Sequence, residues 1–211
     1  MNDIQEIAAV PASENPTPVS TGNGILPNWV FALEVDLTVK GGGKDISIDF
    51  SGGSLWDSGS PQNTRAILKE IANGEKKYFK NLGYMADKRM SAHLKYNDIC
   101  FIFYLCEKID WEYSASQTPI SLNNGDYYNK YVRDSYRVDK NGNNIPPKII
   151  AADCRTAYVV INGVGCYNYK PSDSFPFNLL VDLMYKSTSG VRRKLPIVID
   201  PEIQWPGGTR P

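Results

Sequence analysis

The sequence predicts a mainly β fold, an antiparallel β-sandwich of the jelly-roll or immunoglobulin-like type. Three observations lead to this prediction: apolar and polar residues alternate along several segments, turn-forming residues separate those segments, and helical spacing occurs only near residues 60–85. Seven or eight strands with few helices bury their apolar faces when two sheets pack together. The prediction includes a short helical insertion around residues 60–85 and an extended N-terminal arm.

Length and composition limit the possible classes of function. The chain has 211 residues, of which 42% are apolar and 22% are charged, as is ordinary for a globular protein. Lys and Arg number 23 together, and so do Asp and Glu, so the formal net charge is zero. This balance argues against a nucleic-acid partner, because phosphate binding favours a basic excess. No apolar run approaches the roughly 20 residues that cross a bilayer, so a membrane partner is not expected.

Residues 1–26 differ in composition from the rest of the chain, being rich in Pro, Ser, Thr, Asn and Gly. Such a composition predicts an extended or disordered arm, followed by a single sandwich domain over residues 27–211. The arm has neither the basic region nor the long apolar region of a secretory signal peptide. The sequence therefore predicts a cytoplasmic protein.

The clearest strand signal lies in residues 31–40, where apolar residues occupy every second position. Residues 41–44 (GGGK) then predict a turn, and residues 46–50 resume the alternation, so the two segments form a predicted β-hairpin. One polar face indicates a half-buried antiparallel strand. The apolar face of the first segment consists of Phe31, Leu33, Val35, Leu37 and Val39.

The helical insertion is predicted from its caps and its spacing. Ser60 suits the N-cap, Pro61 the first helical position and Asn73-Gly74 the C-terminal end. A narrow apolar stripe lies between them, and a second short helix is predicted over about residues 75–82. We expect the insertion to cap one end of a sheet. The stripe consists of Ile67, Leu68 and Ile71.

Residues 98–113 are the most apolar segment and predict one buried strand. The odd-numbered residues from Ile99 to Tyr113 are apolar except Glu107, while the even-numbered ones are apolar as far as Cys106 and charged afterwards. A strand that begins covered on both faces and ends with one face in water has this pattern. Cys100 and Cys106 are then packing residues and not a reactive thiol site.

The second half of the chain begins with a polar, tyrosine-rich segment over residues 123–147, which predicts a long loop and a hairpin turned at Asn141-Gly142. Four strand candidates follow, within residues 148–154, 156–164, 177–186 and 194–203. A turn at residues 188–193 should join the last two as a hairpin. Pro196 predicts that the last of them is an edge strand or contains a bulge.

No catalytic residue, cofactor or metal site is predicted. The cysteines lack metal-ligand spacing and His93 is the only histidine, which argues against zinc. Residues 139–144 begin like a calcium loop but lack its glycine and its bidentate glutamate, so a plain turn is expected.

The carboxylate pairs Asp110/Glu112 and Asp200/Glu202 are expected to be strand ends in solvent. The four cysteines, Cys100, Cys106, Cys154 and Cys166, are expected to be reduced and buried, with one disulfide after export as the alternative.

Aromatic and charged side chains suggest an interaction surface. Exposed Tyr and Trp combine a large apolar face with a polar tip, which suits them to protein interfaces and to stacking on sugars. The alternative is that these aromatic side chains rim or fill the core. The candidate surface consists of Tyr127, Tyr128, Tyr131, Arg133, Tyr136 and Trp205.

The end of the chain, FPFNLLVDLMYK followed by LPIVIDPEIQ, resembles the C-terminal strands of the bacterial inclusion-body protein family (PixA/AidA type). Those proteins also end with an F-x-F strand, a turn and a D-P-x-I sequence. The resemblance covers about the last 35 residues and does not extend to the helical insertion or the arm. It implies a cytoplasmic β-sandwich that self-associates, with no catalytic residues to carry over.

The leading hypothesis is a non-catalytic β-sandwich that acts by self-assembly as a homo-oligomer or by association with a protein partner. An arm that docks on a neighbour and an edge strand at Pro196 would be natural contact points. The second hypothesis is a module that binds a small ligand, a carbohydrate in particular, through loop Tyr and Trp residues. The third is an enzyme whose site has no recognisable motif.

Overall fold

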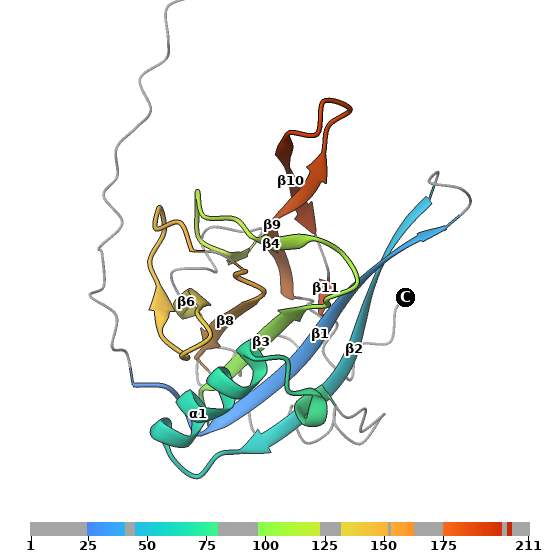
Figure 1. Ribbon diagram of the computed structural model, residues 1–211. Helices are drawn as coiled ribbons and strands as arrows, with labels where there is room; N and C mark the ends of the chain where they lie inside the picture. The colour runs from blue at the N-terminus through green and yellow to red at the C-terminus, as the bar shows by residue number, and fades with distance from the viewer. Residues whose placement is uncertain are drawn as a thin grey trace, which may run out of the picture.

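The computed structural model describes residues 25–40, 45–79, 97–122, 132–151, 153–162, 175–199 and 202–203. Within them the chain forms two β-sheets and one α-helix, so the predicted mainly β sandwich is confirmed (Figure 1). Sheet A has the strand order β2-β1-β3-β8-β6-β7, and in sheet B the order is β10-β9-β11, with β4 and β5 also paired to β9. The elements are β1 (Trp29–Lys40), β2 (Asp45–Asp57), α1 (Pro61–Ala72), the 3-10 helix η1 (Lys76–Phe79), β3 (Ile99–Leu105), β4 (Trp111–Tyr113), β5 (Ile120–Leu122), β6 (Val132–Val138), β7 (Asn144–Ile145), β8 (Thr156–Ile161), β9 (Phe175–Lys186), β10 (Arg192–Ile199) and β11 (Glu202–Ile203).

The main core lies between the two sheets. Sheet A contributes alternate residues of β1, β3 and β8, and sheet B contributes residues of β4, β5, β9 and β10. Aromatic rings meet across this core, with Phe103 and Phe177 at a centroid distance of 5.1 Å. Burying such rings contributes strongly to the stability of the core, because each removes a large apolar area from water.

A second core lies on the other face of sheet A, beneath α1. Ile67, Leu68 and Ile71 of the helix pack against β1, β3 and β8, so every residue of β3 is buried. The caps are as predicted, since Ser60 Oγ accepts a hydrogen bond of 3.2 Å from the backbone N–H of Asn63. The expectation that the helix caps one end of a sheet was wrong, because it covers a sheet face instead.

The β1–β2 hairpin is confirmed, with Lys40 opposite Asp45, although the predicted turn at residues 41–44 lies outside the described residues. On its other side β1 pairs with β3 in parallel. Parallel neighbours need a long crossover, and α1 lies within this connection. The helix thus covers the outer face of the strands that it connects.

The prediction of one strand over residues 98–113 was wrong after Leu105. β3 ends there, the chain turns through residues 106–110, and β4 belongs to sheet B. Arg155 stabilises this crossing, since its Nη1 donates to the carbonyls of Cys106 at 3.0 Å and Ile109 at 2.9 Å. The thiols of Cys100 and Cys106 are buried, as expected of packing residues.

The β9–β10 hairpin is confirmed and projects beyond the rest of the sandwich in Figure 1. β10 pairs only with β9 among the described strands, so Pro196 does lie on an edge strand. Ile199 is buried, but Leu195 and Tyr185 are exposed, so the apolar face predicted for these strands is covered only near the sandwich.

Leu26 is buried in the core beneath α1, just before the first strand. Residues 1–24, which contain most of the predicted arm, lie outside the described residues. A deletion that tests the arm should therefore end at residue 24, so that the core keeps Leu26.

The predicted hairpin turn at Asn141-Gly142 joins β6 to β7 and lies against α1. Asp139 Oδ1 accepts hydrogen bonds from the backbone N–H groups of Asn141 and Asn143, at 2.8 and 2.7 Å, which forms the plain turn that was expected in place of a calcium loop. Arg65 of the helix donates to the Gly142 carbonyl at 2.9 Å. The turn between β6 and β7 therefore also contacts the helix α1.

Replacing Gly142 by alanine should lower the free energy of unfolding by about 2 to 3 kcal/mol. Gly142 has a φ of +84°, and a Cβ atom there would lie 2.9 Å from Lys69 Cβ and 3.2 Å from the Arg65 carbonyl oxygen. Gly190→Ala is the matched control, because its φ is +79° but nothing lies within 4 Å. The control should cost only about 1 kcal/mol in urea-induced unfolding. Equal losses for the two variants would contradict the close approach to the helix.

Candidate functional site

Exposed apolar side chains gather on the β9–β10 hairpin. Of the eight large hydrophobic residues that are exposed among the described residues, four lie on this hairpin. Leu195 is 50% exposed and Val198 59% exposed, and both belong to the edge strand β10. The other two are Tyr185 and Val191. Such a gathering on one projecting element is typical of an interaction surface.

Among the described residues, no strand pairs with the outer edge of β10. Along each strand of an antiparallel pair, residues that hydrogen-bond to the partner strand alternate with residues whose backbone groups point away from it. The hydrogen bond of 2.9 Å from the Ser187 N–H to the Val191 carbonyl shows that the odd-numbered residues of the hairpin bond across it. It follows that the even-numbered residues of β10 direct their backbone groups away from β9. Pro196 stands at one of these outward positions, where its missing N–H costs no bond to β9. The other outward positions are Arg192, Lys194 and Val198.

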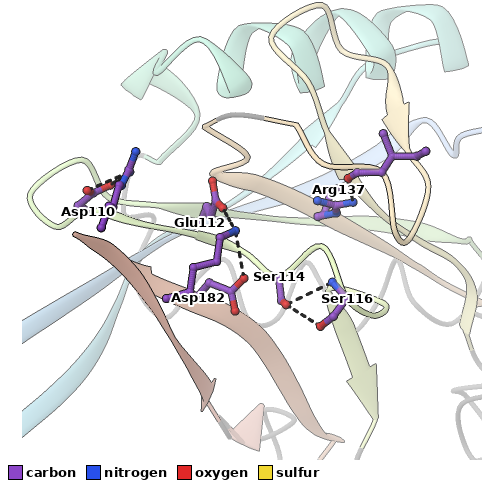
Figure 2. Close-up of polar contacts among 9 residues, drawn as sticks. Asp110, Glu112, Ser114, Ser116, Arg137 and Asp182 are labelled. Carbon is purple, nitrogen blue, oxygen red and sulfur yellow. Dashed lines mark hydrogen bonds and ion pairs between the residues drawn. The ribbon is translucent and has the colours of Figure 1, made fainter. Parts of the chain in front are cut away.

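Two of the three cations of β10 form ion pairs with carboxylates on or next to the neighbouring strands, Asp110, Glu112 and Asp182, which are labelled in Figure 2. Arg192 contacts both oxygens of Asp110, at 2.9 and 3.0 Å. Lys194 Nζ lies 2.6 Å from Glu112 Oε1 and 3.6 Å from Asp182 Oδ2. The arrangement follows from pairing, because β4, β9 and β10 lie side by side and place Glu112 next to Asp182.

A buried arginine lies near these carboxylates (Figure 2). Arg137 is 1% exposed, and its Nη2 donates to the carbonyls of Pro146 and Ile149, at 2.9 and 2.7 Å. Burial lowers the pKa of its guanidinium, while Cys154, Glu112 and Asp182 act in the opposite direction. The side chain therefore remains a cation and fixes the segment that follows β7.

A polar hollow of about 340 Å³ lies at the C-terminal end of α1. A larger and more open hollow of about 620 Å³ runs beside it along the last turns of the helix. The polar hollow brings Asp, Arg and Tyr side chains together, which is the combination that could suggest an enzyme. Its lining consists of Ala72, Asn73, Tyr104, Glu107, Lys140, Asp153 and Arg155.

The polar groups of this hollow bind one another. The Tyr104 hydroxyl donates to Glu107 at 2.6 Å, and Lys140 lies 3.6 Å from Asp153. The hydrogen bond from Tyr104, with smaller effects of nearby cations, lowers the pKa of Glu107, and burial raises that of Tyr104. Glu107 is therefore ionised and Tyr104 neutral at pH 7, so neither titrates near neutrality as efficient acid–base catalysis requires.

The interaction surface proposed from the sequence is only partly described. Arg133 is exposed and forms an ion pair of 2.8 Å with Asp98. Tyr136 is half-buried beside Tyr158, with ring centroids 6.0 Å apart, in the core beneath α1. The remaining four residues, Tyr127, Tyr128, Tyr131 and Trp205, lie outside the described residues.

The other candidate residues fall into plain structural roles where they are described. Cys154 is buried, like Cys100 and Cys106, and burial raises the pKa of all three thiols. Glu112 is largely buried in its ion pair and is not the solvated strand end that was expected. Cys166, His93 and Asp200 lie outside the described residues.

Neither a metal site nor a membrane helix is found where side chains are described. No group of three or more His, Cys, Asp and Glu residues is placed to hold a metal ion in that part of the chain. No helix there is long and apolar enough to span a bilayer.

The open edge of β10 was recognised in the sequence only through Pro196. The exposed apolar residues and the ion pairs were missed, because they depend on which strands flank β9. One signal was present: the sequence RRKLPIVI is basic in its first half and apolar in its second. That asymmetry is unusual for a strand with one buried face.

Comparison of the chain with family models, with curated proteins and with solved structures finds no match. The resemblance to the inclusion-body protein family therefore stays a prediction.

Proposed function

We propose that the protein is a non-catalytic association module that binds a second copy of itself through the edge strand β10. The observation that carries the proposal is the backbone edge of an eight-residue strand with which no other described strand pairs and on which Leu195 and Val198 are exposed. An edge of this kind can pair with another strand and thereby gain main-chain hydrogen bonds.

Most of the positive charge on β10 is already paired within the molecule and therefore opposes association only weakly. Lysine and proline on an edge strand usually discourage pairing between molecules. Here Arg192 is already paired with Asp110, and Lys194 with Glu112 and Asp182, so Arg193 is the cation of β10 that docking has to accommodate. Pro196 removes a single donor and leaves its carbonyl available.

Sedimentation of the intact chain tests the proposal. We expect the 23.6 kDa chain to become a dimer as its concentration rises to about 100 μM, where a contact of about 5.5 kcal/mol would be half formed. A chain that stays monomeric over this range would contradict self-association.

Val198→Pro should weaken the dimer at least about tenfold, because it removes an outward N–H from each copy. The bond to β9 is unaffected, since the Val198 amide points away from that strand. Val198→Thr is the matched control, because it keeps the N–H. Both variants should retain the far-ultraviolet circular dichroism of the native chain. If Val198→Pro dimerises as tightly as Val198→Thr, the contact does not use this edge.

A further inference from the structure

We propose that two copies pair through β10 in antiparallel orientation, with Leu195 of each copy on the two-fold axis. This inference rests on the proposed function and adds the register and the symmetry of the contact. Its basis is the order of side chains along the outer edge, read together with the direction of each backbone group.

Backbone geometry allows only a few registers. In an antiparallel pair, residues that point their N–H and C=O groups at the neighbouring strand lie opposite residues that do the same. The outward positions of β10 are therefore placed opposite one another. A two-fold axis can then pass only through a residue between two outward positions or through an outward residue itself.

The side chains favour the axis at Leu195 over its neighbours. An axis at Lys194 would place that lysine opposite its own copy, and an axis at residue 193 would place Arg192 opposite Lys194. Each of these two registers allows only about four hydrogen bonds between the copies. An axis at Pro196 would place two prolines opposite each other, with no donor between them. An axis at residue 197 would pair only the last residues of β10 in the two copies, because the strand ends at Ile199.

The Leu195 axis pairs the basic half of each strand with the apolar half of the other. Arg192 then lies opposite Val198 of the second copy, and Lys194 opposite Pro196 of the second copy. Each Arg192–Val198 pair can form two hydrogen bonds and each Lys194–Pro196 pair one, which gives about six in all. This is the largest number that any of the registers allows.

The same register covers Leu195 and Val198, two of the four exposed apolar side chains of the hairpin. Leu195 would contact Leu195 of the second copy across the axis, where strands approach most closely. The aliphatic part of Arg192 can extend over Val198 of the second copy while its guanidinium stays with Asp110. The ion pairs of sheet B are kept, so dimer formation breaks none of them.

A cysteine scan tests the register. Leu195→Cys, Lys194→Cys and Pro196→Cys are each introduced into a Cys166→Ser background, and the intact chains are exposed to oxidised glutathione at concentrations where the wild type dimerises. The native thiols of Cys100, Cys106 and Cys154 are buried and should not react. Across the proposed axis the two Cα atoms of residue 195 would be about 4.5 Å apart, within the range of a disulfide.

We expect Leu195→Cys to form a linked dimer at least about tenfold faster than the other two variants. Faster linkage at residue 194 or 196 would overturn the register while leaving self-association through β10 in place. Absence of linkage at all three positions in a chain that still sediments as a dimer would place the contact elsewhere, and overturns both the register and the use of β10. A chain that is monomeric throughout would overturn the proposed function together with this inference.

Leu195→Glu provides a second test that needs no oxidation. The substitution places two carboxylates opposite each other only if residue 195 lies on the axis, and we expect dimerisation to weaken at least about thirtyfold. Ile150→Glu is the control, because this residue is also apolar and exposed but does not belong to the β9–β10 hairpin. Equal effects of the two substitutions would contradict the register.

Discussion

Replacing Arg137 by alanine should lower the free energy of unfolding by about 3 to 5 kcal/mol, a large part of the stability of a domain of this size. The substitution leaves the carbonyls of Pro146 and Ile149 without their donor, and it removes the buried cation close to Glu112 and Asp182. The cavity left by a fully buried side chain and a carboxylate that has lost a neighbouring cation are both costly. Urea-induced unfolding followed by circular dichroism measures the loss.

Arg133→Ala is the matched control for this prediction, because it removes the same side chain from the same strand. Arg133 is exposed, and its ion pair with Asp98 lies at the surface. Such a pair contributes at most about 1 kcal/mol, so the control should unfold close to the native midpoint. Arg137→Met should lie between the two, since methionine fills the space but donates no hydrogen bond. A loss below 1 kcal/mol for Arg137→Ala would show that the segment after β7 does not depend on this guanidinium.

Arg137 also shows where sequence reasoning ends. Its neighbours in residues 123–147 are polar and rich in tyrosine, so the pattern indicates a surface segment. The residue is buried because its partners are main-chain carbonyls of the loop that follows β7. The pattern of side chains along a sequence does not indicate where a main-chain carbonyl will lie, so this contact could not be predicted from the sequence.

Local structure was easier to predict than the position of elements in space. The caps of α1 follow from the properties of Ser60 and Pro61 themselves, and they are confirmed. That β3 would be covered on both faces also follows from its own residues, and this is confirmed as well. What the sequence did not reveal is that these two facts are connected, since the helix is what covers the second face.

The crossing at residues 106–110 was missed because apolar parity continues through it. Both sheets face the same core, so a chain that passes from one to the other keeps its odd-numbered residues pointing inward. Phe103 in sheet A and Trp111 in sheet B are examples. The clue was the group of three charged residues within 107–110, which interrupts an otherwise apolar run.

Trp111→Ala should cost about 3 to 5 kcal/mol of unfolding free energy, because this side chain fills the core where the chain crosses between the sheets. The indole is 1% exposed, and its Nε1 donates to the Cys106 carbonyl at 2.7 Å. It therefore packs between the sheets and also holds the first residue of the crossing.

Trp111→Phe separates these two contributions. Phenylalanine keeps most of the apolar volume but leaves the Cys106 carbonyl without the indole donor, although Arg155 Nη1 still donates to it. The loss should then fall to about 1 to 2 kcal/mol. Both variants are compared with the native chain by urea-induced unfolding followed by far-ultraviolet circular dichroism, a signal that does not depend on the tryptophan removed. If the alanine and phenylalanine variants lose the same stability, the hydrogen bond to Cys106 and not the packing of the ring determines the effect, and the crossing is held by its backbone contacts.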